Sequence, residues 1–387
     1  MDVAITGIGL HPFGRFEGTS VTDMGVTAVK AALAEAGRPR FQAAFCATVY
    51  SGVAAGHKVL GALGLTGVPI VNVEAGCASG GAALMLAASA IDNGQYDTVL
   101  VFGMEKMPKG IIRSSFFEPW REQGGLAVTP AYFALRAQRL MRESGVTKEH
   151  LARVVVKNRG NGADNPNAMF QRATTAADVL ASRVVCEPLH LHMLCSPNEG
   201  AAAVVLQRAG GAAGGAGGAG GAGGAGATVR IAAAALRSHL PGSVLGEATP
   251  MSGIDDTDIA PPSTLAADAA YEQAGIGPDA IQVVECQDTD AARELLGYEE
   301  LRLCERGDAA ALLDRGATER GGRVPVNPSG GLLAKGEPLG ASALGQVVEL
   351  TQQLRGTAGP RQVEGARVAL AHTVGRGANA AVLILTT

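Results

Sequence analysis

The chain has 387 residues, enough for two domains or for one large domain with a substantial core. Its net charge of -4 and the lack of any Lys/Arg-rich block argue against nucleic acid as a partner. Every long apolar run contains Gly, Asp or Asn, and the first residues have no basic flank, so neither a membrane span nor a signal peptide is expected. The six cysteines form no CxxC pair and no metal-type spacing with the seven histidines. These features predict a cytoplasmic, thiol-reduced protein without a bound metal.

The first 208 residues alternate between strand and helix patterns. Two stretches interrupt this alternation, one at residues 108–129 with the single Trp and one around residues 165–188. Both lack clean periodicity and predict loop excursions, which commonly carry binding functions. The predicted strands are Val3–Ile8, Phe41–Val49, a strand ending at Val73, Thr98–Met104 and Ala201–Leu206; the predicted helices include Val21–Ala36, Tyr132–Ser144 and Lys148–Arg159.

Residues 209–227 form an almost pure Gly/Ala tract without side chains that could build a core. Such a tract predicts a flexible linker between residues 1–208 and residues 228–387. The second half repeats the alternation of the first, so we expect an α/β protein of two similar layered units. Its predicted strands are Val229–Ala235, Ile281–Cys286, Arg367–His372 and Ala380–Leu385, and its predicted helices are Thr264–Ala274 and Ala341–Leu354.

Cys77 lies where a predicted strand gives way to an Ala/Leu/Met-rich helix that ends at Asp92-Asn93-Gly94. At a helix N-terminus, the unpaired N–H groups and the helix dipole favour a thiolate. Glycines beside it leave room for a substrate or another main chain to approach. The residues alone therefore allow either a nucleophile or a buried cysteine acting as a small apolar residue.

Four motifs resemble those of the thiolase family. They are GCASG around Cys77, CSPNEGAAA from Cys195, ECQDTD from Glu285, and NPSGG from Asn327 continuing to KGEPLGA. The third is similar to a segment of the sterol-carrier-protein, or nonspecific lipid-transfer-protein, branch. The resemblance implies the thiolase fold, with two five-stranded βαβαβαββ halves in a five-layer α-β-α-β-α sandwich. It also implies a homodimer that uses a coenzyme A thioester as substrate and needs no other cofactor.

Three positions depart from the catalytic pattern of that family. Gln287 and Thr289 stand where the branch has a histidine and a second cysteine, and Glu337 replaces the histidine of the GHP motif. Glutamine cannot shuttle a proton, and a threonine hydroxyl has too high a pKa to replace a thiol. Glu337 can act as a base, although its charge would repel a Cys77 thiolate.

The remaining candidate residues serve oxyanion or substrate binding. The N–H groups of Cys77 and Gly375 can form an oxyanion hole, and His372 lies three residues before Gly375. The resemblance places Asn327 and Thr289 at substrate-binding positions. His372 is also interpretable as a structural hydrogen-bonding residue.

Three functions remain open from the sequence. The first is an acyltransferase that forms or cleaves a C–C bond next to a CoA thioester through acyl-Cys77, on a substrate other than acetoacetyl-CoA. The second is a retro-aldolase acting on a β-hydroxyacyl-CoA, with Glu337 or an aspartate of the 287–290 segment as base. Such proteins resemble enzymes that pair with a small zinc-ribbon/OB-fold partner. The third is a non-catalytic subunit of a thiolase complex.

Overall fold

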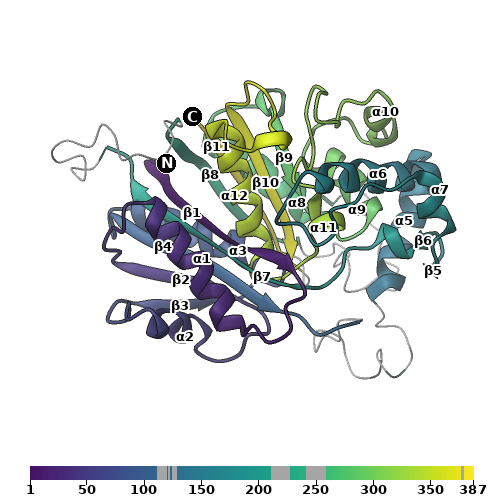
Figure 1. Ribbon diagram of the computed structural model, residues 1–387. Coiled ribbons are helices and arrows are strands. Elements are labelled where there is room, and N and C mark those ends of the chain that lie inside the picture. The colour runs from purple at the N-terminus through teal and green to yellow at the C-terminus, as the bar shows by residue number, and fades with distance from the viewer. Residues whose placement is uncertain (111–119, 121–122, 124–128, 211–226, 241–258, 376–378) are drawn as a thin grey trace.

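The computed structural model describes residues 1–110, 120, 123, 129–210, 227–240, 259–375 and 379–387 (Figure 1). Most of the predicted excursion at residues 108–129 and of the Gly/Ala tract at 209–227 lies outside these described residues. Both therefore remain predictions.

The first half of the chain forms a five-stranded mixed sheet in the order β3-β2-β4-β7-β1. β2 runs parallel to β3 and β4, whereas β7 runs antiparallel to both β4 and β1. The strands are β1 (Val3–Gly14), β2 (Ala43–Ala47), β3 (Ile70–Val73), β4 (Thr98–Lys106) and β7 (Glu199–Arg208), and the helices are α1 (Val21–Glu35), α2 (Ala55–Ala62) and α3 (Ser79–Asp92).

The second half continues the sheet in the order β8-β11-β10-β9. Its expected fifth strand is reduced to a parallel bridge between Val284 and Val326. β1 and β8 join the halves through two antiparallel residue pairs. The strands are β8 (Val229–Ser238), β9 (Val283–Cys286), β10 (Val368–Gly375) and β11 (Asn379–Thr386), and the helices are α8 (Pro262–Ala274), α9 (Ala291–Glu300), α10 (Ala309–Asp314), α11 (Gly331–Lys335) and α12 (Ser342–Arg355).

Three hydrophobic cores fill the spaces between five layers. One packs α1 and α2 on the outer face of the first half-sheet, through residues such as Met24 and Leu100. The central core places α3 and α12 between the half-sheets, with Leu84 and Leu344 from the helices and Leu383 from β11. The third covers the outer face of the second half-sheet with α8 and α9. Figure 1 shows α3 and α12 between the purple-to-blue and green-to-yellow halves. The expected five-layer α/β arrangement is confirmed.

The segment between β4 and β7 leaves its own half and packs on the other. α5 and α6 contact α9, and α6 also contacts α11, so these helices lie beside the second half (Figure 1). This crossing brings the residues just before β7 next to loops of the second half. The segment contains α5 (Thr129–Ser144), α6 (Lys148–Ala163), α7 (Ala176–Ala181), β5 (Val184–Cys186), β6 (Leu189–His190) and the 3-10 turn η1 (Leu191–Met193); two further 3-10 turns are η3 (Pro278–Ala280) and η4 (Gly359–Arg361).

Several elements differ from the sequence prediction, among them α2 and β1. α2 was not predicted, because its eight residues are too short for a clear helical period. β1 continues six residues past Ile8 to Gly14. Pro12 falls at a register shift between the pairs His11–Ala201 and Gly14–Glu199, where a strand tolerates the missing N–H.

The Gly/Ala tract has only a short distance to span. Arg208, at the end of β7, pairs with Val3, and Val229, at the start of β8, pairs with Ile5. Both therefore flank the same end of β1, roughly 10 Å apart by the usual strand spacing. About six residues are enough for that distance. We predict that deleting residues 213–224 leaves the melting temperature and activity unchanged, because loop closure costs little. A variant that aggregates or melts many degrees lower would contradict this.

Candidate active site

Cys77 lies in the turn between β3 and α3. β3 ends at Val73, and α3 begins at Ser79 with Ala78 as its N-cap, which makes no side-chain capping bond. The turn is closed from within, because the Ser79 hydroxyl accepts the N–H of Ala75 at 2.9 Å. Cys77 is partly exposed. The structure thus places the thiol at the positive end of a 14-residue helix, where it remains accessible.

Gly375 packs directly against the Cys77 turn. A Cβ atom at Gly375 would lie 2.0 Å from the carbonyl oxygen of Ala75, so only glycine allows this approach. α3 is packed just as closely, because a Cβ at Gly81 would lie 2.5 Å from the Cβ of Ala381. The end of β10 and the Cys77 turn are therefore neighbours, as an oxyanion hole shared by Cys77 and Gly375 requires.

Glu337 is placed by a turn that depends on glycine. Gly336 adopts φ +84°, and a Cβ there would lie 2.0 Å from the side-chain amide of Asn198. The Glu337 N–H then donates to the carbonyl of Ser196 at 2.9 Å. Glu337 is 4% exposed, so its carboxylate is held inside the protein.

Gln287 is the direct partner of Glu337. Its Nε2 donates to Glu337 Oε1 at 3.1 Å, while its Oε1 accepts the N–H of Val374. Because a backbone N–H can only donate, the Gln287 oxygen must face Val374 and its NH₂ must face Glu337. Gln287 therefore ties the Glu337 carboxylate to the end of β10, where Gly375 lies.

Cys195 also belongs to this cluster, which the sequence analysis did not foresee. Its Sγ donates to Glu337 Oε2 at 3.4 Å, and its N–H donates to the carbonyl of Thr289 at 2.9 Å. Desolvation, followed by the Glu337 carboxylate, raises the pKa of the Cys195 thiol well above its usual value, and Cys77 contributes to the same shift. The CSPNEGAAA motif marked the segment, but no spacing in the sequence linked position 195 to position 337.

The polar residues next to Gln287 mainly hold the loop in place. Asp288 accepts the N–H groups of Leu332 and Leu333 at 2.6 and 3.1 Å and so caps α11. Asp290 caps α9 by accepting the N–H of Arg293 at 3.0 Å, and Thr289 donates its hydroxyl to Asp290 at 3.4 Å. Burial, followed by other carboxylates, raises the pKa of Asp288. The aspartates are thus engaged as caps, which leaves Glu337 as the carboxylate facing the cysteines.

Asn327 is fully buried and sits behind the site rather than in it. Its Oδ1 accepts the N–H of Cys286 at 2.9 Å, and its Nδ2 donates to Glu294 at 2.7 Å. These bonds attach the NPSGG segment to the end of β9. The geometry favours a positioning role over the substrate contact expected from the resemblance.

His372 belongs to a different cluster. It is fully buried, its Nε2 lies 3.0 Å from the hydroxyl of Ser263, and burial followed by the charge of Arg293 lowers its pKa to about 3. The ring is therefore neutral near pH 7. These contacts connect it to α8 and α9 instead of Cys77, and they support the structural alternative for this residue.

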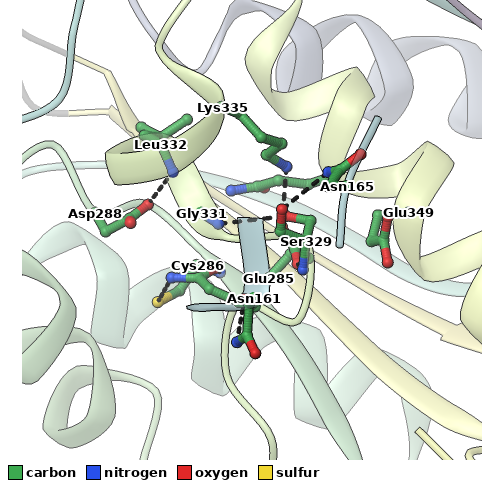
Figure 2. A network of polar contacts seen from close by, with 12 residues as sticks. Asn161, Asn165, Glu285, Cys286, Asp288, Ser329, Gly331, Leu332, Lys335 and Glu349 are labelled. Carbon is green, nitrogen blue, oxygen red and sulfur yellow. Dashed lines mark hydrogen bonds and ion pairs between the residues drawn. The ribbon is translucent and has the colours of Figure 1, made fainter. Parts of the chain in front are cut away.

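A buried ionic network lies next to the Glu337 turn (Figure 2). Lys335 forms an ion pair with Glu285 at 3.1 Å, and Glu285 also accepts the N–H of Ser329 at 2.9 Å. Asn165 donates to the Ser329 carbonyl at 2.9 Å, which connects this network to the segment after α6. The network fixes α11, and Glu337 follows α11 by two residues.

We predict that Cys77 reacts as a thiolate below the pKa of a free thiol. Its place at the N-terminus of α3 favours the charged form. The pH dependence of iodoacetamide labelling, read at Cys77 by peptide mass spectrometry, should show an inflection below about 8.5. An inflection at or above that value would show that the nearby Glu337 charge outweighs the helix terminus.

Within the part of the chain that the structure describes, no group of three or more His, Cys, Asp or Glu side chains is arranged to hold a metal ion. No helix there has the length and apolar character needed to cross a bilayer.

Comparison with known proteins gives the family. Residues 3–179 match the thiolase N-terminal domain, and residues 249–387 match the thiolase C-terminal domain-like family. Sterol carrier protein 2 of Gallus gallus is 34% identical over 97% of this chain and 70% of its own length. The benzoylsuccinyl-CoA thiolase subunit BbsB of Thauera aromatica is 34% identical over 98% of this chain and 96% of its own. A solved Ltp2-ChsH2(DUF35) aldolase superposes with a TM-score of 0.84 at 26% identity, covering 100% of this chain and 98% of that one.

The chain belongs to the thiolase family and has the thiolase fold. Within the family it belongs to the sterol-carrier-protein-2-thiolase-like branch. This membership supports acyltransferase chemistry on acyl-CoA as its general activity.

Proposed function

We propose that the protein forms or cleaves a C–C bond next to a CoA thioester through an acyl-Cys77 intermediate. The observation that carries this proposal is the convergence of a helix-terminal thiol, Gly375 at the end of β10 and a buried Glu337 carboxylate held by Gln287. Gln287 and Thr289 cannot form an enolate as the family residues do, so we propose a substrate other than acetoacetyl-CoA unless another group of the site moves the α-proton. Enolate formation by the enzyme is not required if the released fragment is already a stabilised carbanion, or if the acceptor is itself a nucleophile.

Each residue has a defined task in this scheme. Cys77 attacks the carbonyl carbon, and the N–H groups of Cys77 and Gly375 receive the developing oxyanion. Glu337 accepts hydrogen bonds from Gln287 and Cys195 and is the carboxylate available as a base. CoA is a substrate, and the scheme uses no further cofactor.

The test is direct trapping of the acyl-enzyme. Wild-type protein is incubated with a panel of acyl-CoA and 3-oxoacyl-CoA esters, quenched in acid and examined by intact and peptide mass spectrometry. We expect an acyl group on Cys77, lost in Cys77→Ser and retained in Cys304→Ser, which changes a cysteine outside the cluster. No labelling of Cys77 by any ester would refute the covalent step.

The aldolase is a second candidate, favoured by the superposition with the Ltp2-ChsH2(DUF35) aldolase. In this case Glu337 deprotonates the hydroxyl of a β-hydroxyacyl-CoA, and the C–C bond breaks without a bond to Cys77. Cleavage that persists in Cys77→Ala would select this reaction over acyl transfer.

A small partner protein is part of the proposal. One relative is a subunit of benzoylsuccinyl-CoA thiolase, and one solved relative is an Ltp2-ChsH2(DUF35) aldolase. We propose a zinc-ribbon/OB-fold partner encoded near this chain. The third candidate, a non-catalytic subunit, would show as no acyl-CoA turnover either alone or with the products of neighbouring genes.

A second copy of the chain is the other partner we propose. β3 is the edge strand of the sheet formed by the described residues, and Val71 on it is 44% exposed. Leu86, on the neighbouring α3, is 40% exposed. Exposed edge strands with apolar side chains favour pairing with another chain. We expect a dimer by light scattering and a monomer for Val71→Asp; a monomeric wild type would exclude this interface.

The six cysteines all lie in the described residues and form no disulfide. That state matches a reducing compartment. The proposal therefore keeps a cytoplasmic location.

A further inference from the structure

Cys195 lies between two loops of the second half of the chain. Leu194 forms an antiparallel bridge with Asp290, and Pro197 forms a parallel bridge with Glu337. The segment 194–197 therefore joins the loop after β9 to the turn before α12. This position follows from the crossing of residues 129–198 onto the second half, which no local sequence pattern shows.

Two cysteines are the accessible reactive groups of the cluster. Cys77 and Cys195 are both partly exposed, whereas Gln287, Thr289 and Glu337 are 2%, 4% and 4% exposed. A substrate entering the site therefore meets two thiols. The buried Glu337 carboxylate lies behind Cys195 and is linked to the substrate side through the hydrogen bond that the Cys195 thiol donates to it.

The surroundings of Cys195 favour the protonated thiol. Desolvation and the Glu337 carboxylate raise its pKa, and Asp288 and Cys77 act in the same direction. No cation contributes to that shift among its main causes. A thiol held protonated beside a carboxylate acceptor is poised to give its proton to a carbanion and to regain it afterwards. Thr289 cannot do this, because its hydroxyl does not ionise near neutral pH.

We propose that Cys195 is the acid–base residue that moves the proton at the α-carbon of the acyl-CoA. Its S–H bond to Glu337 and its main-chain bond to Thr289 hold the thiol in the cluster that contains the proposed nucleophile. The assignment rests on the proposed acyl-CoA chemistry of this site and adds a residue to it.

The proton and electron balance is complete with the groups named. In cleavage, the bond between the α- and β-carbons breaks, and its electron pair stays on the α-carbon of the thioester. The Cys195 proton moves to that carbon, a C–H bond forms, and Cys195 becomes a thiolate. The thiolate takes the proton of the incoming CoA thiol, whose sulfur attacks acyl-Cys77 and releases Cys77 as a thiolate.

The experiment measures α-hydrogen exchange. Wild-type protein is incubated with acetyl-CoA or propionyl-CoA in D₂O, and deuterium in the acyl group is followed by mass spectrometry. Cys195→Ser keeps a donor to Glu337 but cannot ionise near neutral pH, so exchange should fall by about a hundredfold or more. The same variant should still become acylated at Cys77, which separates loss of proton transfer from loss of the whole site. Cys186→Ser, in a partly exposed cysteine on β5, is the matched control and should exchange as wild type does.

The pH profile separates proton transfer from packing. Exchange should rise as Cys195 ionises, and Glu337→Gln should move that rise to lower pH by removing a neighbouring negative charge. Exchange that survives in Cys195→Ser, or wild-type protein that acylates Cys77 but exchanges nothing, would overturn the assignment. Exchange that depends on Cys195 without any acyl-Cys77 would keep the assignment and refute the covalent function.

Discussion

Replacing Glu337 by glutamine is expected to lower turnover about a hundredfold or more while leaving the fold intact. The glutamine oxygen can still accept from Gln287, and its NH₂ then faces the Cys195 sulfur, which now accepts instead of donating. The hydrogen-bond geometry is thus retained, but the base is lost. The measurement is steady-state thiolysis of the 3-oxoacyl-CoA that the wild type uses best, with the melting temperature recorded alongside.

Unchanged or improved turnover in Glu337→Gln would mean that Glu337 has no catalytic role. If Glu337 is only tolerated, the glutamine variant should make Cys77 more reactive toward iodoacetamide and leave turnover unchanged or improved, because a like charge has gone. Glu364→Gln, at an exposed position, is the control for a simple change of charge. An unchanged turnover in Glu337→Gln would therefore remove Glu337 from the mechanism.

Restoring the family histidine separates the functions further. A gain of ordinary acetoacetyl-CoA thiolysis in Glu337→His would mean that the site lacked only an oxyanion donor. We expect instead a loss of native activity without such a gain. Gln287 presents its NH₂ to position 337, and Thr289 still stands where the family has a cysteine, so one histidine does not rebuild the set.

The sequence was sufficient to predict the fold, because local patterns and motifs report it directly. The strand-to-helix change around Cys77 and the stop at Asp92-Asn93-Gly94 both appear where they were predicted, and α3 spans Ser79–Asp92. The motifs also gave the family, because GCASG and NPSGG keep their residues and spacing. Local patterns could not predict which side chains form hydrogen bonds with one another in the folded protein.

Cys195 shows why the site was only partly predictable. Its partners, Thr289 and Glu337, are remote in sequence, and they meet only because the segment between β4 and β7 crosses onto the other half. His372 shows the reverse relation. Its nearness to Gly375 along the chain suggested the site, but alternate residues of a strand face opposite sides, and its ring contacts Ser263. Proximity in sequence and proximity in space diverge at both residues.

The second large effect is expected from the buried ion pair that supports the Glu337 turn (Figure 2). Lys335 and Glu285 side chains are 5% and 1% exposed and lie 3.1 Å apart. Lys335→Met fills similar space but leaves Glu285 charged and buried, and Ser329 is then its one remaining bonded partner among the described residues. Breaking such a pair costs about 3 to 5 kcal/mol. The melting temperature should therefore fall by about 4–6 °C for a chain of 387 residues, measured by differential scanning fluorimetry.

The size of that effect depends on the stranded charge, and a second substitution isolates it. Glu285→Gln in the Lys335→Met background removes the uncompensated carboxylate, so the double variant should melt above Lys335→Met alone. Lys109→Met, which breaks an exposed pair with Glu17, should shift the melting temperature by about 1 °C or less. If Lys335→Met melts like the Lys109 control, the pair does not hold the turn. If instead Lys335→Met melts lower, and the double variant recovers stability but not turnover, Lys335 positions Glu337 as well as stabilising α11. The structure offers a route for this effect, because Asn198 donates to the Lys335 carbonyl at 2.7 Å, next to Gly336.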